Sequence, residues 1–164
     1  MSPHTVGCLP TVLFIAHVID ERIIVMQPYI HTVQYYETDK MGIVHHSNYI
    51  RWMEEARVDY LEKVGWSYDK LEKMGIVSPV TSVTCNYKAS TTFADVISVS
   101  VALTSFNGVT LKISYEMRNA DDKIVCTAQS EHVFLNEKGM FIRLHREYPD
   151  LYAFLCTKTE NKTS

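Results

Sequence analysis

The most informative absences in this 164-residue chain concern paired cysteines, basic charge and long apolar runs. The four cysteines (Cys8, Cys85, Cys126 and Cys156) contain no CxxC pair, which leaves neither a recognisable zinc-ligand spacing nor a disulfide framework. We therefore expect thiols in a reducing compartment and a cytoplasmic protein. The net charge of −3 excludes the strongly basic face that nucleic-acid binding requires.

No segment is apolar over a length that could span a membrane. The segment Val12–Ile19 is short, is interrupted by His17 and has no basic residue before it. A membrane-spanning helix needs about 20 apolar residues and a signal peptide needs a positive start, so we expect neither. The regular pattern begins near Met26. Residues 1–25 are therefore expected to be an N-terminal extension, either an extra strand or a disordered tail.

Periodicity divides the rest of the chain into one long helix and several strands. Alternating apolar residues predict a strand over residues 29–36. Apolar residues three and four apart predict an amphipathic helix over residues 47–64 that ends at Gly65, with Ser47 or Asn48 as its N-cap. A second helix is expected over 67–73, and further strands over 80–88, 96–106, 109–118 and 124–135.

Turn residues separate the later strands, and Asn107–Gly108 is the strongest hairpin signal among them. Further turns are expected at Asn119–Asp122 and Asn136–Gly139. Strands with one apolar face most economically wrap around the long helix, so the pattern predicts an α+β fold with an antiparallel sheet. Residues 26–143 would form this domain, and residues 144–164 would add a C-terminal helix and tail.

That final region is expected to form a helix over residues 145–155. Pro149 lies near its start, and proline is tolerated in the first turn of a helix. The last seven residues, KTENKTS, are polar and are expected to be disordered.

The segment Tyr35–Arg57, YYETDKMGIVHHSNYIRWMEEAR, carries the candidate chemistry. Asp39 lies in a short loop that contains Gly42, and His46 follows where the long helix is expected to begin. Free backbone N–H groups at the start of a helix stabilise a developing negative charge. A carboxylate beside such N–H groups suits attack on a carbonyl carbon, so an enzyme is the first hypothesis.

This motif resembles that of the hot-dog-fold acyl-CoA thioesterases of the 4-hydroxybenzoyl-CoA thioesterase type. The matching residues read D39-x-x-G42-I-V-H-H46-S-N48-Y49, followed by E54, E55, A56 and R57. A weaker match is Tyr87-Lys88 followed by Phe93-Ala94-Asp95, where relatives often have glycine before the aspartate. The resemblance implies a long central helix wrapped by an antiparallel sheet of about five strands.

The resemblance also implies an assembly and a substrate. Relatives form homodimers with two active sites at the subunit interface, and many dimers assemble further into tetramers. Coenzyme A would lie across that interface with its pantetheine arm directed toward the Asp39 loop. No metal and no redox cofactor is implied.

For thioester hydrolysis, Asp39 would act either as the nucleophile, which gives an acyl anhydride, or as the general base for water. A plainer interpretation is that Asp39 only caps a turn. The backbone N–H near His46 would form the oxyanion site, and the His46 side chain would orient water, bind the thioester oxygen or assist proton transfer. His45 is expected to point the opposite way.

The remaining candidates serve substrate binding. Gly42 would allow a positive φ and a close approach of the backbone to substrate. Asn48 and Tyr49 would fix the loop against the helix and are assigned a secondary role in substrate binding. Lys88 is the best candidate for the nucleotide phosphates of coenzyme A. Lys112, Arg118 and Lys123 are weaker candidates, and any of these cations can equally be a solvated surface charge.

Other residues of the helix are expected to be structural. Arg57 would form an ion pair with Glu54 or Glu55 on the helix face. Trp52, Met53 and Tyr60 would fill the core. A metal site built on His45 and His46 lacks a recognisable ligand spacing and is not expected.

The sequence thus predicts a cytoplasmic acyl-CoA thioesterase that hydrolyses an acyl thioester to free acid and CoA. An acyl-carrier-protein thioesterase is the alternative within the same class, since the same loop serves both thiols. A non-catalytic acyl-CoA-binding protein is the alternative from another class, although a pure binder has no need of Asp39.

Overall fold

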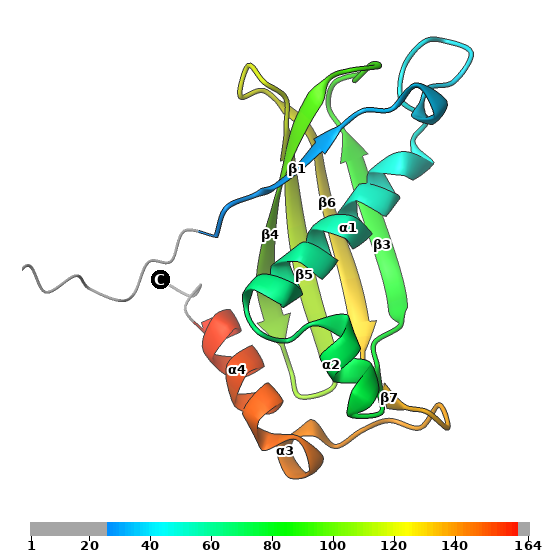
Figure 1. Cartoon of the computed structure of the whole chain (residues 1–164). Coiled ribbons are helices and arrows are strands. Elements are labelled where there is room, and N and C mark those ends of the chain that lie inside the picture. Colours follow the sequence, from blue (N-terminus) through cyan, green and yellow to red (C-terminus); the bar gives the residue numbers. More distant parts are fainter. Residues whose placement is uncertain (1–25, 161–164) are drawn as a thin grey trace, which may run out of the picture.

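A computed structural model of the chain describes residues 26–160 (Figure 1). The strands are β1 (Tyr29–Thr32), β2 (Ile76–Val77), β3 (Val80–Tyr87), β4 (Val96–Phe106), β5 (Thr110–Arg118), β6 (Ile124–Val133) and β7 (Leu135–Asn136). The helices are the 3-10 helix η1 (Tyr35–Glu37) and the α-helices α1 (Ser47–Lys63), α2 (Tyr68–Lys73), α3 (Leu144–Glu147) and α4 (Pro149–Glu160). The predicted extension, residues 1–25, lies outside the described residues.

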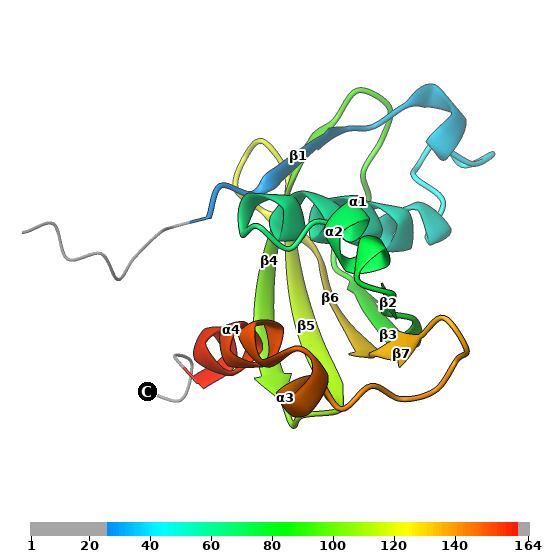
Figure 2. The same ribbon diagram turned by 60° about the horizontal axis from the view of Figure 1, so that its bottom comes forward.

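Five strands form one antiparallel sheet in the order β1-β4-β5-β6-β3, and α1 lies across one face of it (Figures 1 and 2). The short strands β2 and β7 pair separately. The hairpin predicted at Asn107–Gly108 joins β4 to β5, and the side chain of Asn107 accepts the N–H groups of Val109 and Thr110. The α+β prediction of a long helix against five antiparallel strands is confirmed.

The core lies between α1 and the sheet. Trp52, Met53 and Tyr60 of α1 are buried, as expected of residues that fill the core. On β5 the buried residues Leu111, Ile113, Tyr115 and Met117 alternate with more exposed ones, which is the period of a strand with one covered face. The helix and the sheet therefore bury their predicted faces against each other.

The two ends of α1 differ in how well they were predicted. At the C-terminal end Gly65 has φ +78°, as expected of a residue that ends a helix. At the N-terminal end the predicted caps Ser47 and Asn48 are both wrong, because His46 occupies the cap position and has no side-chain capping bond. The side chain of His45 substitutes in part, since its Nδ1 accepts the Ser47 N–H at 3.4 Å.

The strand predicted over residues 29–36 ends at Thr32. The chain then turns into η1, which breaks the alternation, so Tyr35 and Tyr36 are 76% and 79% exposed while Glu37 is only 4% exposed. Glu37 is thus buried, like His31 and Val33, while the two tyrosines before it are exposed.

The predicted C-terminal helix is two helices. Pro149 has no backbone N–H and disfavours helical geometry at the preceding residue, and Tyr148 accordingly has φ −141° between α3 and α4. Leu151 and Leu155 of α4 are buried in the core, and α4 packs against β4 (Figure 2). Residues 158–160, expected to be disordered, belong to α4.

Ala94, which stands where relatives often have glycine, has an unusual backbone conformation. Ala94 has φ +69°, a region that side-chain-bearing residues adopt at a cost of about 1 kcal/mol. Its N–H donates to the carbonyl of Val33 at 3.0 Å, and the next residue, Asp95, accepts the Thr92 N–H at 2.8 Å. These hydrogen bonds hold Ala94 in a conformation with positive φ, which glycine would adopt without this cost.

Candidate active site

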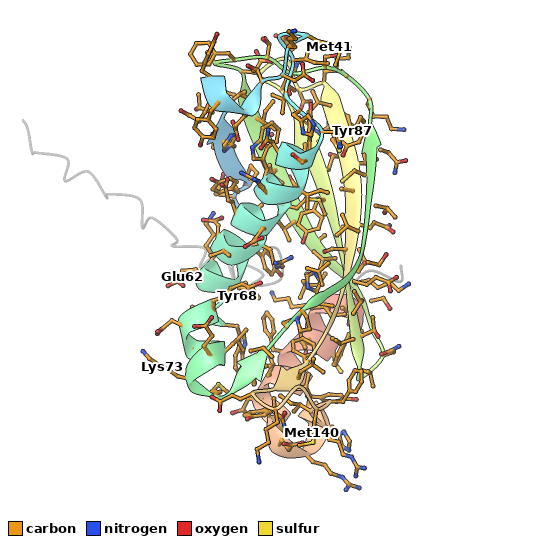
Figure 3. The ribbon with its side chains drawn as sticks, turned by 90° about the vertical axis from the view of Figure 1, so that its right-hand side faces the viewer. Met41, Glu62, Tyr68, Lys73, Tyr87 and Met140 are labelled. Atoms are coloured by element: carbon orange, nitrogen blue, oxygen red, sulfur yellow. The ribbon has the colours of Figure 1, made fainter. Side chains whose placement is uncertain are left out.

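A cleft of about 300 Å³ lies where the Asp39 loop, the start of α1 and the end of β3 meet. It is lined by Asp39, Met41, Ile43, Val44, His46, Tyr49, Tyr87, Lys88, Ala89 and Ser90. Figure 3 shows Met41 and Tyr87 at the same end of the molecule, far from Lys73 and Met140. Four of the predicted site residues, Asp39, His46, Tyr49 and Lys88, therefore share one cleft.

The loop around Asp39 is a compact turn. Asp39 donates its N–H to the carbonyl of Ile43 at 2.8 Å, and its own carbonyl accepts the Gly42 N–H at 2.9 Å. Gly42 has φ +75°, as the sequence analysis expected. Oδ1 of Asp39 accepts the Met41 N–H at 2.7 Å, whereas Oδ2 has no hydrogen-bond partner within residues 26–160. Asp39 thus caps a turn and lines the cleft at the same time.

The predicted oxyanion donor at the start of α1 is the backbone N–H of His46. Within the described part of the chain, no acceptor is paired with the backbone N–H of His46. His46 is exposed and its φ is −51°. The rings of His45 and His46 lie 4.1 Å apart, so the expectation that His45 points the opposite way is wrong. Nδ1 of His45 is bonded to Oγ of Ser47 at 2.9 Å, and His45 does not line the cleft.

Asn48 and Tyr49 both tie α1 to neighbouring segments. The Tyr49 hydroxyl is bonded to Oγ1 of Thr91 at 2.8 Å, and its ring lines the cleft. The Asn48 amide donates to the backbone carbonyl of Glu37 at 2.8 Å. Asn48 is buried and is not among the cleft-lining residues, so its contacts are those of a residue that fixes the loop against the helix.

Tyr87 was given no role in the sequence analysis, although it precedes Lys88 in the weaker motif. Its hydroxyl donates to the carbonyl of His46 at 3.1 Å, and its ring lies 5.1 Å from that of Tyr49. Burial and the neighbouring Cys85 raise the pKa of Tyr87 to about 12, so it stays a hydrogen-bond donor at neutral pH. Tyr87 thereby joins the end of β3 to the start of α1.

A second residue that sequence reasoning missed is Glu37. Its Oε2 accepts from Nε2 of His31 at 2.9 Å and from the Gln34 N–H at 2.7 Å, and its Oε1 accepts from the Trp52 indole at 2.8 Å. Burial opposes ionisation, but these donors hold the pKa of Glu37 below its ordinary value. We call His31, Glu37, Asn48 and Trp52 the loop-stem cluster. The only signal in the sequence was an acid close before Asp39.

The four cations that were candidates for phosphate binding differ in whether they line the cleft and whether they pair with a carboxylate. Lys88 lines the cleft and has no carboxylate partner within residues 26–160. Lys112 pairs with Glu131 at 2.8 Å, and Arg118 pairs with Glu116 at 2.8 Å. Lys123 lies in the turn between β5 and β6 and is not among the cleft-lining residues.

Arg57 does not form the predicted ion pair with Glu54 or Glu55. It is buried, its Nε donates to the Tyr68 hydroxyl at 2.8 Å, and its Nη1 lies 3.4 Å from Nε2 of His132. The i,i+3 rule failed here because Arg57 is on the sheet-facing side of α1. The Ser130 hydroxyl lies 2.7 Å from the same His132 nitrogen and 3.0 Å from the Tyr115 hydroxyl. We call Arg57, Tyr68, Tyr115, Ser130 and His132 the helix–sheet cluster.

Within residues 26–160, no three His, Cys, Asp or Glu side chains gather as they would around a metal ion. No helix in the same part of the chain is long and apolar enough to cross a membrane.

Comparison with known proteins places this chain in a family. The chain is 33% identical to a DHNA-CoA thioesterase from Staphylococcus aureus, whose crystal structure superimposes with a TM-score of 0.76 over 82% of this chain and 91% of that one. It is 31% identical to YneP of Bacillus subtilis over 74% of this chain and 88% of that protein. It is 27% identical to the acyl-CoA thioester hydrolase YbgC of Escherichia coli, over 59% of this chain and 72% of that one. The sequence profile of the thioesterase-like superfamily matches residues 33–150. The chain belongs to the thioesterase-like superfamily and has the hot-dog fold.

Proposed function

We propose that this protein is an acyl-CoA thioesterase that hydrolyses an acyl thioester to the free acid and CoA. The observation that carries the proposal is that Asp39 and His46 line one cleft, and that the His46 N–H has no acceptor within residues 26–160. The proteins similar to this chain support it, because the named activities of the Staphylococcus aureus and Escherichia coli relatives are both hydrolysis of a CoA thioester.

In this mechanism the thioester carbonyl oxygen accepts the His46 N–H at the start of α1, which stabilises the oxyanion. Oδ2 of Asp39, the oxygen without a hydrogen-bond partner within residues 26–160, then acts in one of two ways. It attacks the carbonyl carbon and expels CoA thiolate, and water later cleaves the resulting anhydride. Alternatively, it takes a proton from a water molecule that attacks directly. Both routes consume one water and yield one acid and one thiol.

The two routes differ before steady state. A nucleophilic Asp39 releases about one equivalent of CoA in a rapid burst if cleavage of the anhydride is slow, and the enzyme then gains the mass of the acyl group. A general base gives thiol and acid together with no acylated enzyme. Rapid-quench assays with intact-protein mass spectrometry distinguish them.

We infer that the working unit is a homo-oligomer, a dimer or tetramer, with active sites at the subunit interface. The edge strand β3 supports this inference, since it pairs with β6 on one side only and leaves Val80 and Tyr87 about half exposed. In that assembly Lys88 would contact a phosphate of CoA. Light scattering after size-exclusion chromatography tests the oligomeric state, and a monomer at assay concentration that hydrolyses acyl-CoA would contradict it.

The test of function is thiol release from short, long and aromatic acyl-CoAs by wild type and Asp39→Asn. The variant keeps the size of the side chain but lacks the charge, and we expect it to lose about a hundredfold or more in kcat/KM. Asp121→Asn is the matched control, because Asp121 is an exposed residue of the β5–β6 turn. Equal activity of Asp39→Asn and wild type would mean that Asp39 is only structural.

The same panel separates the alternatives. Hydrolysis of acyl-carrier-protein thioesters without hydrolysis of acyl-CoA would identify a carrier-protein thioesterase. Binding of acyl-CoA without turnover of any thioester would identify a non-catalytic binding protein and contradict the proposal.

A further inference from the structure

We propose that Glu37 is a positioning residue that holds Asp39 and the start of α1 in register. The proposal rests on the proposed function, because it concerns the geometry of the same cleft. Glu37 is not among the residues that line the cleft, so any effect of its side chain must be indirect, through the backbone of the loop or through Trp52, whose ring lies 4.7 Å from that of the cleft-lining Tyr49.

The Glu37 carboxylate joins three separate segments beneath the loop. It accepts from His31 on β1, from the Gln34 N–H at the start of η1 and from the Trp52 indole in the middle of α1. Glu37, His31 and Trp52 are all buried, and the His31 and Trp52 rings lie 4.7 Å apart. These donors fix both the position and the orientation of the carboxylate.

The backbone of the same residue holds the loop. The Glu37 carbonyl accepts the His45 N–H at 2.9 Å and the Asn48 side-chain amide at 2.8 Å. His45 immediately precedes the proposed oxyanion donor, and Asn48 lies in the first turn of α1. Asn48 and Trp52 are four residues apart, so the side chain and the carbonyl of Glu37 engage the same face of α1.

The loop closes directly after this point. Thr38 and Val44 form a β-bridge, and Asp39 bonds to Ile43 just inside it. Glu37 is therefore the last residue before the loop that is fixed from both its side chain and its carbonyl. A shift of Glu37 moves Asp39, two residues later, relative to the His46 N–H, and a misplacement of about 1 Å can cost about a hundredfold in rate.

Glu37→Gln tests this role with little change in volume. A carboxamide has one acceptor oxygen, whereas the native carboxylate accepts from three donors across both oxygens. At least one of those donors must then face an NH₂ group. We expect kcat to fall about tenfold or more while KM stays within about threefold, since no cleft-lining side chain is altered.

Ser130→Ala is the control for a merely structural effect. Ser130 is buried and hydrogen-bonded to Tyr115 and His132, and it is not among the cleft-lining residues. Its loss should lower the melting temperature without changing kcat per folded molecule. If Glu37→Gln does not fold, His31→Phe replaces it, because phenylalanine keeps a ring against Trp52 but removes one donor to Glu37.

A second readout does not depend on activity. Hydrogen exchange at the Asp39 and His45 N–H groups should accelerate in Glu37→Gln and not in Ser130→Ala. Folded Glu37→Gln with kcat within about twofold of wild type and unchanged exchange would overturn the positioning role. Wild type without thioesterase activity would refute the proposed function alone, and the exchange rates would still decide whether Glu37 holds the loop.

Discussion

The loop-stem cluster and the helix–sheet cluster both include residues of α1, but they connect α1 to different parts of the protein. Except for the partly exposed Tyr68, the members of both clusters are buried, and both clusters are made of polar groups with hydrogen-bond partners. The first centres on the carboxylate of Glu37, which is surrounded by donors. The second centres on the guanidinium of Arg57, whose hydrogen-bond partners include the neutral side chains of Tyr68, Tyr115 and His132.

The two clusters differ in how close they lie to Asp39 and to the start of α1. Glu37 is two residues from Asp39 and its carbonyl binds the start of α1, whereas Arg57 lies in the second half of α1 and faces β6. The loop-stem cluster should therefore control the rate of the reaction, and the helix–sheet cluster should control the free energy of unfolding. Burial of polar groups does not by itself mark a functional site, because both clusters are buried.

The largest expected effect concerns the helix start itself. His46→Pro removes the backbone N–H, and the native φ of −51° lies within the range that proline adopts. His46→Ala removes the side chain and keeps the N–H. If the N–H stabilises the oxyanion, kcat of His46→Pro should be about 10²–10³ lower than that of His46→Ala.

Steady-state assays of the two His46 variants measure directly how much the backbone N–H contributes to kcat. Circular dichroism and thermal unfolding should show that both fold, since residue 46 precedes the first turn of α1. Equal kcat values for two folded variants would exclude the N–H as the oxyanion donor.

Acid should act through the helix–sheet cluster. Burial and the charge of Arg57 lower the pKa of His132 to about 4, from an ordinary value of 6.5. Above pH 6.5 His132 is neutral in the folded and unfolded chain and causes no pH dependence. As the pH falls from 6.5 toward 4, the unfolded chain binds a proton first, so stability is lost, by up to about 3 kcal/mol from this group.

Urea unfolding between about pH 7.5 and pH 5 measures this loss, and His132→Gln should show a smaller one. The His132 ring resonances of wild type, followed by NMR, supply an independent check. A midpoint near the ordinary value would refute the assignment of a buried neutral imidazole.

The smallest effect is expected at the rim of the cleft. Lys88→Ala should raise KM for acyl-CoA about two- to fivefold, since an exposed charge pair contributes only about 0.2–1 kcal/mol. The same variant should leave KM unchanged for an acyl pantetheine thioester, which lacks the nucleotide phosphates. Lys123→Ala is the matched control, because it removes a lysine that does not line the cleft. An equal effect on both substrates would show that Lys88 does not bind a phosphate.

Several predictions from the sequence held because they depend on local contacts. The spacing of Trp52, Met53 and Tyr60 defines one face of a helix regardless of what covers it, and Asn107–Gly108 fixes a hairpin within four residues. Asp39, His46 and Tyr49 were identified because their motif resembles that of a known family. With Lys88 they lie in one cleft. The pairing of Arg57 with a nearby glutamate failed because a helical spacing rule ignores which side of the helix is buried.

Sequence alone determined the order of the long helix and the main strands, the apolar faces of α1 and β5 and the candidate Asp39 motif. Tertiary structure decided which polar groups meet. Glu37 meets Trp52 across 15 residues, Tyr87 of β3 meets His46 across 41 residues, and Arg57 meets His132 across 75 residues. The physical reason is that a periodic pattern records which positions are buried. A buried polar side chain is stable only with a hydrogen-bond partner, and packing alone brings a distant partner to it.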